Sequence, residues 1–180
     1  MRINAATSTL LIIDIQARLF PAIHDSAALA ENALWLQQVA QRIGVPVLLT
    51  EQYSKGLGQT IPSLRDGHQA SAIIEKLHFS AVSDGELFKR PGGARAQFVV
   101  CGSEAHVCVL QTVLDLLVQG RQVFVVAEAV GSRQASDKAL ALARMQQAGA
   151  SIVSREMVAF EWLEQAGNPL FREVSKAFIR

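Results

Sequence analysis

The sequence predicts a three-layer α/β/α fold built on a doubly wound, mostly parallel sheet of six strands. Short apolar runs alternate with segments of helical periodicity along the 180 residues. The apolar runs are continuous rather than alternating with polar residues, which is typical of parallel strands covered by helices on both faces. Because crossovers between parallel strands are right-handed, we expect the strand order 3-2-1-4-5-6.

Five strands are predicted from strongly apolar runs, and a sixth from a shorter run that charged residues interrupt. The five apolar runs are residues 9–13, 45–50, 96–101, 122–127 and 150–153. The shorter run is Ile73–Lys76. In the expected order the first and fourth strands are neighbours, and ligands of such sheets bind outside the carboxyl ends of these strands.

Four helical segments are expected between and after the strands. The first has Asp25 or Ser26 as its cap and Gly44 at its end. The other three cover residues 109–119, 136–148 and 169–179. The first helix carries an apolar stripe at helical spacing, which consists of Leu29, Ala33, Leu36, Ala40 and Ile43. The segment 109–119 is apolar on most sides, which indicates deep burial and favours a homo-oligomer.

The length predicts one domain, residues 1–180, and the composition is typical of a compact soluble enzyme or binding domain. Half of the residues are apolar, 18% are charged and the net charge is +1, so nucleic acid is not expected as a partner. We expect no membrane association, because no run approaches the ~20 apolar residues of a membrane span. The N-terminal segment does not have the pattern of a signal peptide. Two cysteines do not make a disulfide framework, which favours a cytoplasmic location.

Two residues with chemical potential follow the neighbouring first and fourth strands. Asp14 comes directly after the first strand, and Cys108 lies between the fourth strand and the next helix. A thiol at a helix start sits at the positive end of the helix dipole, so we expect its pKa to be lowered. Cys101 falls within the strand pattern and is expected to be a small buried hydrophobe.

Each candidate partner of Cys108 also has an ordinary structural interpretation. Asp14 either accepts the thiol proton or caps a loop, and Lys76 either stabilises the thiolate and the aspartate or is a solvated edge lysine. His78 and His106 are rival bases or pocket walls. The spacings of a dinucleotide fingerprint, a phosphate loop and a zinc site are missing from the sequence, so neither a cofactor nor a metal is expected.

Considered together, these residues and three longer motifs resemble one family. The order Asp14, Lys76, Cys108 is similar to that of the isochorismatase-like cysteine hydrolases. The subgroup called isochorismatase domain-containing is similar through TEQYSKGLGQTIP (50–62), CGSEAHVC (101–108) and ALARMQQAG (141–149). The resemblance spans essentially the whole chain.

The resemblance implies a catalytic triad of Asp14, Lys76 and Cys108. It also implies a cis peptide between Ser103 and Glu104, and an oxyanion hole formed by the backbone N–H groups of Glu104 and Cys108. The residues expected to line the substrate pocket are Phe20, Tyr53, His78 and His106.

The activity implied is cofactor-independent hydrolysis of a small amide or carbonyl compound through an acyl-thioester on Cys108. Nicotinamidases of the family carry an Asp-x-His metal pair where this chain has Glu51-Gln-Tyr53, so a metal-dependent nicotinamidase is not expected. Ala105 stands where the family often has threonine. Three alternatives stay open: isochorismate-type ether hydrolysis on the same scaffold, a thiol redox or sensing role, and a non-catalytic scaffold.

Overall fold

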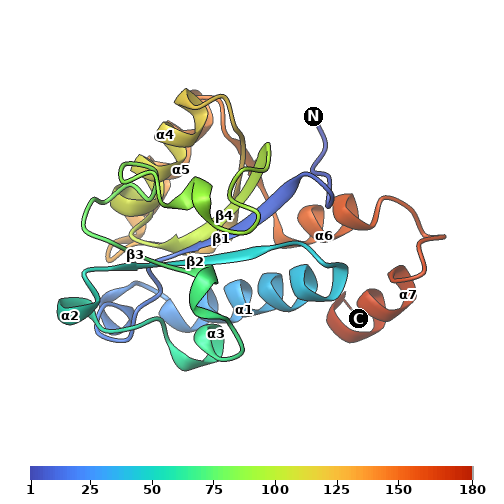
Figure 1. The fold of residues 1–180 in the computed structure, drawn as a ribbon, viewed down its shortest axis with the longest axis horizontal. Helices are drawn as coiled ribbons and strands as arrows, with labels where there is room; N and C mark the ends of the chain where they lie inside the picture. Colours follow the sequence, from blue (N-terminus) through green and yellow to red (C-terminus); the bar gives the residue numbers. More distant parts are fainter. Residues whose placement is uncertain (180) are drawn as a thin grey trace.

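The computed structural model describes residues 1–179 and contains a six-stranded, all-parallel sheet in the order β3-β2-β1-β4-β5-β6 (Figure 1). This confirms the predicted fold class and strand order. The strands are β1 (Ser8–Ile13), β2 (Val47–Gln52), β3 (Ile73–Lys76), β4 (Gln97–Ser103), β5 (Gln122–Gly131) and β6 (Ser151–Val153).

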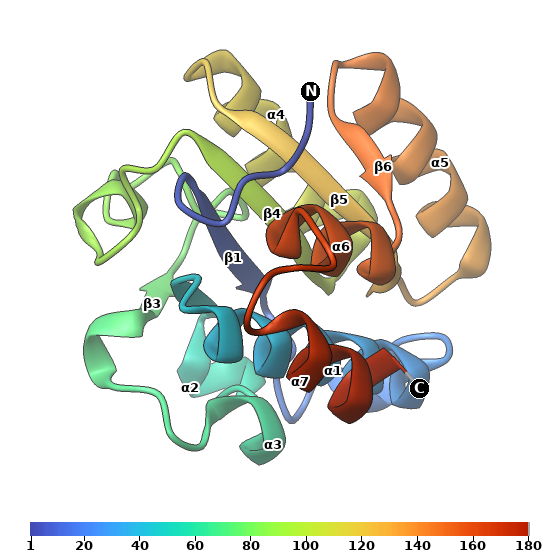
Figure 2. The same cartoon turned by 90° about the vertical axis from the view of Figure 1, so that its right-hand side faces the viewer.

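Helices cover both faces of the sheet, as the continuous apolar strands require. In Figure 1, α4 and α5 lie above the sheet and α1 lies below it, and Figure 2 shows α6 and α7 near α1. The helices are α1 (Ser26–Ile43), α2 (Ser54–Leu57), α3 (Pro62–Arg65), α4 (Leu110–Val118), α5 (Ala135–Gln147), α6 (Arg155–Leu163) and α7 (Phe171–Val174). Within residues 1–179, none of these helices has the length and apolar character needed to cross a bilayer.

The sheet separates two hydrophobic cores, and β1 contributes to both. Leu10 and Ile12 pack on the side of α1 and α6, whereas Leu11 and Ile13 pack on the side of α4 and α5. Alternate side chains of a strand point to opposite faces, so a fully apolar strand is needed wherever both faces are covered. The two cores hold β1 rigidly, and the residue that follows β1 therefore has a fixed position.

The predicted helices are present, with three differences at their boundaries. Asp25 occupies the N-cap position of α1 in a left-handed conformation (φ 54°), but its side chain makes no capping hydrogen bond to a described residue, nor does the side chain of Ser26. A π-helical turn, Ala105–Val109, precedes α4, and a second one, Ser175–Ile179, follows α7. The sequence analysis did not predict α2, α3 or α6.

Close packing at the ends of β1 and β4 prepares the candidate site. Ile13 pairs with Gly102, which has a φ of 144°. A Cβ atom at residue 102 would collide with the backbone of Ile13. Glycine is therefore required for this approach, which brings the residues after β1 close to those after β4.

Candidate active site

Asp14 is a buried carboxylate at the carboxyl end of β1. Its backbone has a left-handed conformation (φ 52°), and its side chain is fully buried. One carboxylate oxygen accepts a hydrogen bond from the Thr50 hydroxyl (2.6 Å), and the other pairs with the Lys76 ammonium (2.7 Å). Burial of a carboxylate is costly unless it is paired and hydrogen-bonded, and both conditions are met here.

Lys76 is the last residue of β3, and only 3% of it is exposed. Besides Asp14, its Nζ donates to the side-chain oxygen of Gln52 (2.7 Å) and to the backbone carbonyls of Phe79 (2.8 Å) and His78 (3.3 Å). The interpretation of Lys76 as a solvated edge lysine is therefore wrong, because its ammonium group is enclosed by oxygen acceptors. These contacts fix its charge beside Asp14.

Cys108 lies within the π-helical turn between β4 and α4 and is 5% exposed. It lines the same cavity as Asp14, and the charges of Asp14 and Lys76 both act on its thiol. Burial raises the pKa of the Cys108 thiol from an ordinary value of 9.0 to about 12, the negative charge of Asp14 adds to this rise, and the positive charge of Lys76 opposes it. The expected lowering of this pKa is wrong, because burial and two carboxylates outweigh the lysine and the helix.

These three side chains, which are distant in the sequence, therefore meet at one point of the sheet edge. The π-helical turn places the thiol at this point, and such turns are frequent at functional sites. In the resting state the sulfur carries its proton and faces a carboxylate. A carboxylate that lies beside a thiol is positioned to accept its proton during a reaction.

The peptide between Ser103 and Glu104 is trans, as are all the peptides of residues 1–179, which corrects the expected cis bond. The chain reverses instead through the left-handed conformation of Glu104 (φ 54°, ψ 61°). A non-proline cis bond costs ~3–4 kcal/mol, and the turn at Glu104 makes it unnecessary.

A cavity of about 300 Å³ opens beside the Cys108 sulfur. Four apolar side chains form much of its wall, while polar groups gather near Cys108 and at one side. The lining residues are Asp14, Leu19, Gln52, Leu57, Phe79, Glu104, Val107, Cys108 and Arg133. The mixture of apolar walls and a few convergent polar groups is typical of small-molecule sites.

The four residues expected to line the pocket lie elsewhere. Phe20 packs against the core on the α1 side, and the His106 ring hydrogen-bonds the Ser132 hydroxyl (3.0 Å). Tyr53 and His78 line a neighbouring cavity of about 460 Å³, together with Lys76. The residues adjacent to three of these positions line the Cys108 cavity instead, and they are Leu19, Phe79 and Val107.

Arg133 and Glu104 form a charged pair at the cavity that the sequence analysis did not assign. The Arg133 Nε donates to a Glu104 carboxylate oxygen over 2.7 Å, and the other oxygen lies 3.4 Å from the His106 ring. Arg133 is the second residue after the end of β5, at the same sheet edge as Asp14. This position after a strand was the available signal for Arg133.

The Glu51 side chain is held in structural hydrogen bonds. Its carboxylate accepts hydrogen bonds from the backbone N–H of Thr60 (2.8 Å) and from Arg65 (3.1 Å). Across residues 1–179, no group of three or more His, Cys, Asp or Glu side chains is arranged to hold a metal ion.

Comparisons with known proteins agree with this architecture. The model of the isochorismatase domain family matches residues 8–157. Isochorismatase domain-containing protein 2A of Mus musculus is 39% identical over 178 residues, which cover 97% of this chain and 84% of that protein.

Two solved structures extend the comparison to three dimensions. The structure of MAR1 ribonuclease from Caenorhabditis elegans has a TM-score of 0.89 and 35% identity, covering 98% of this chain and 91% of that chain. The ycaC gene product of Escherichia coli, described as an octameric hydrolase of unknown specificity, has a TM-score of 0.90 and 24% identity, with 99% and 91% coverage. On the family match and the relatives' identity, this chain belongs to the isochorismatase domain family of hydrolases.

Proposed function

We propose that this protein is a cofactor-independent hydrolase that cleaves a small amide or related carbonyl compound through Cys108. The observation that carries the proposal is that Cys108 and Asp14 line one cavity, where the Lys76 ammonium holds Asp14 at 2.7 Å and both charges act on the thiol. A nucleophile, a base and an orienting group gathered at one cavity form the arrangement that activates weak nucleophiles.

In the first step, Asp14 accepts the thiol proton as the sulfur attacks the substrate carbonyl. The sulfur electron pair forms the S–C bond, and the carbonyl π electrons move to the oxygen. The raised pKa of Cys108 means that the thiol is deprotonated only as the attack proceeds. Lys76 holds Asp14 in place and balances the negative charge that moves onto the sulfur.

In the second step, the tetrahedral intermediate collapses to an acyl-thioester. Asp14 returns its proton to the leaving nitrogen, the C–N bond breaks and an amine departs. Asp14 then takes a proton from water as the water attacks the thioester. The C–S bond breaks and Asp14 returns that proton to the departing sulfur, which gives a carboxylic acid, the free thiol and an ionised Asp14. The net reaction adds one water to the amide.

The proposed oxyanion hole consists of the backbone N–H groups of Glu104 and Cys108. Support comes from the left-handed Glu104 followed directly by the helical turn at Ala105. Successive residues of opposite helical hand align the N–H groups at that turn into an anion-binding concavity, and the Glu104 N–H belongs to it. Two such donors stabilise an oxyanion by ~3 kcal/mol or more.

The cavity favours a compact substrate with an apolar substituent. A volume of about 300 Å³ lies at the lower end for ligand pockets, and Leu19, Leu57 and Phe79 supply apolar walls. The Arg133–Glu104 pair offers a polar contact at one side. We propose a small, uncharged carboxamide as the substrate class.

The C. elegans relative is called a ribonuclease, but the site here favours a small molecule. The chain has a net charge of +1, and Asp14 and Glu104 place negative charge in the cavity. Phosphodiester binding depends on clustered Lys and Arg side chains, and Arg133, the cation in the cavity lining, is already paired with Glu104.

We propose a homo-oligomer in a reducing, cytoplasmic environment. The E. coli relative is described as octameric, and Tyr53, Leu77 and Phe79 are 51%, 70% and 51% exposed near the site. Exposed apolar groups in one region favour contact with another protein surface. Both cysteines are free, as a thiol nucleophile requires.

Mass spectrometry after incubation with a panel of small carboxamides tests the proposed function. We expect an acyl adduct on Cys108 and release of the amine, both of which disappear in Cys108→Ala. Oxidation of Cys108 without an adduct would favour the thiol redox alternative. Cleavage of an enol ether or RNA by Cys108→Ala would contradict the thioester route.

A further inference from the structure

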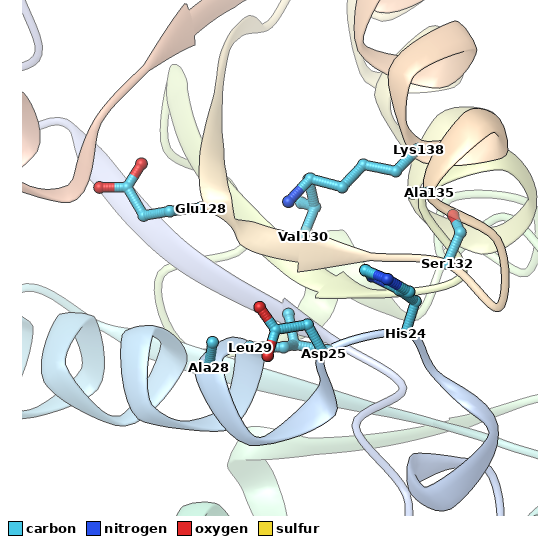
Figure 3. Close-up of a pocket in the computed structure, with 9 residues that line it drawn as sticks. All are labelled: His24, Asp25, Ala28, Leu29, Glu128, Val130, Ser132, Ala135 and Lys138. Atoms are coloured by element: carbon cyan, nitrogen blue, oxygen red, sulfur yellow. The ribbon is translucent and has the colours of Figure 1, made fainter.

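A second cavity lies between the start of α1, the end of β5 and the start of α5 (Figure 3). Its volume is about 210 Å³. Within residues 1–179 it shares no lining residue with the cavity that holds Cys108. The lining residues are His24, Asp25, Ala28, Leu29, Glu128, Val130, Ser132, Ala135 and Lys138.

Lys138 and Asp25 bring opposite charges to this cavity without touching each other. In Figure 3 the Lys138 side chain extends from α5 across the cavity, and the Asp25 carboxylate points into it from the start of α1. Burial lowers the pKa of the Lys138 amine, while the charges of Glu128 and Asp25 oppose that lowering. Among the described residues, Lys138 nevertheless forms no ion pair within 4.0 Å.

The Asp25 carboxylate is available for a ligand, whereas that of Glu128 is engaged. Asp25 is held at φ 54° as the N-cap residue of α1, and its side chain caps no backbone group in residues 1–179. One oxygen of Glu128 accepts the backbone N–H of Arg155 (2.8 Å), and Figure 3 shows this side chain directed away from Lys138. Asp25 is therefore the acidic group that faces the lysine across the cavity.

The floor between the two charges is apolar. Leu29 and Val130 are 3% and 1% exposed and belong to the two cores of the protein. Ser132 also lies at the wall, but its hydroxyl is hydrogen-bonded to His106 (3.0 Å). A ligand that fits must therefore carry a cation, an anion and a short apolar group between or beside them.

We propose that this cavity binds a free α-amino acid with a small aliphatic side chain. Its ammonium group contacts Asp25, its carboxylate contacts Lys138, and its side chain packs on Leu29 and Val130. Such a ligand completes two charge-assisted hydrogen bonds that the protein leaves open across the cavity. The site is separate from the proposed hydrolase centre and does not depend on it.

Titration of the protein with L-valine, followed by calorimetry and by amide chemical shifts, tests this site. We expect saturable millimolar binding, with Lys138→Gln and Asp25→Asn each weakening it by about tenfold or more. Both substitutions replace side chains that are exposed or half-buried. Arg144→Gln, an exposed position on the same helix, is the matched control and should keep the affinity within about twofold.

Acetate and methylammonium, which carry one charge each, should bind at least about tenfold more weakly than L-valine. Binding should persist in Cys108→Ala, which keeps this result distinct from the test of the hydrolase. The proposal is overturned by an absence of saturable binding, by unchanged affinity in Lys138→Gln, or by acetate binding as tightly as L-valine. Loss of binding in Cys108→Ala would place the amino acid in the other cavity and would equally overturn it.

Discussion

The two cysteines of this chain share a burial state and differ in their surroundings. Cys101 is 0% and Cys108 is 5% exposed, and burial is the largest cause of a raised pKa in both. Cys101 lies within β4 and packs in the core on the α1 side, where burial alone accounts for its pKa. Cys108 lies beside Asp14, Lys76 and a cavity.

This difference teaches that a lowered resting pKa is not needed to mark a candidate nucleophile. What separates Cys108 from Cys101 is a carboxylate in the wall of the same cavity and space for a substrate. A base can remove the proton during the reaction, so the resting enzyme keeps a neutral thiol that is protected from oxidation. The predictions below test each part of that contrast.

Removal of each sulfur should separate the two cysteines most strongly. We expect Cys108→Ala to lower turnover of an amide substrate by about 10⁴-fold or more, with little change in the melting temperature. Cys101→Ala should leave turnover within about twofold and destabilise the fold by about 1 kcal/mol, because it opens a small cavity in the core. Steady-state kinetics and thermal unfolding of both variants measure this. Equal loss of activity in the two variants would contradict the assignment.

Asp14→Asn should slow catalysis and at the same time make the Cys108 thiol easier to ionise. Turnover should fall by about 10²- to 10⁴-fold, because the general base is lost. The pKa of Cys108 should fall at the same time, because the negative charge of Asp14 raises it in the parent. Iodoacetamide should therefore label Cys108 faster in Asp14→Asn than in the parent at the same pH. Slower labelling together with slower turnover would show that Asp14 acts in another way.

The same substitution leaves Lys76 buried without its carboxylate. Removal of one partner of a buried ion pair typically costs about 3–5 kcal/mol of stability. Kinetic assays of Asp14→Asn should therefore be run at a temperature at which circular dichroism shows that the variant is folded.

Lys76→Met should move the thiol in the opposite direction. Because the positive charge of Lys76 lowers the pKa of Cys108, its removal should raise that pKa further and slow alkylation. Turnover should fall by about 10²-fold, since Asp14 loses its orientation and the charge balance of the site changes. Alkylation faster than in the parent would contradict the electrostatic role given to Lys76. Exposed Lys55→Met is the matched control and should change neither rate by more than about twofold.

Alkaline stability provides a test that needs no substrate. The pKa of Cys108 is about 12 in the folded chain and has an ordinary value of 9.0. The thiol therefore stabilises the fold fully below pH 9.0, and this contribution is lost as pH rises toward 12. The free energy of unfolding should fall less steeply above pH 9.0 in Cys108→Ala than in the parent. Identical slopes in urea titrations of the two proteins would contradict this linkage.

The fold was predictable because five of the six strands are marked by strongly apolar runs between helical patterns. Asp14 and Cys108 were predictable as neighbours for the same reason, since parallel strands deliver their ends to one edge. The residues that line the pocket were harder to predict from the sequence. Phe20, His78 and His106 are in the correct loops, but their neighbours Leu19, Phe79 and Val107 line the cavity. A shift of one residue reverses the direction of a side chain, and loop periodicity does not determine which residue points inward.

The raised pKa of Cys108 could not be predicted from the sequence either. A thiol before a helix suggested a lowered pKa, whereas burial and the charges of Asp14 and Glu104 raise it. The π-helical turn that places Cys108 and the left-handed turn at Glu104 depend on how β4 and α4 pack together. Helix propensity alone does not indicate such turns.

The central claim is that Asp14 takes the proton from a neutral Cys108 thiol during attack. Titration of the thiolate by its ultraviolet absorbance, in the parent, Cys108→Ala and Asp14→Asn, tests this most directly. The account predicts no Cys108 thiolate in the parent below pH 9.0, under conditions in which the enzyme is active, and a thiolate at lower pH in Asp14→Asn. A parent thiolate that is already formed at neutral pH, and that disappears in Asp14→Asn, would contradict it.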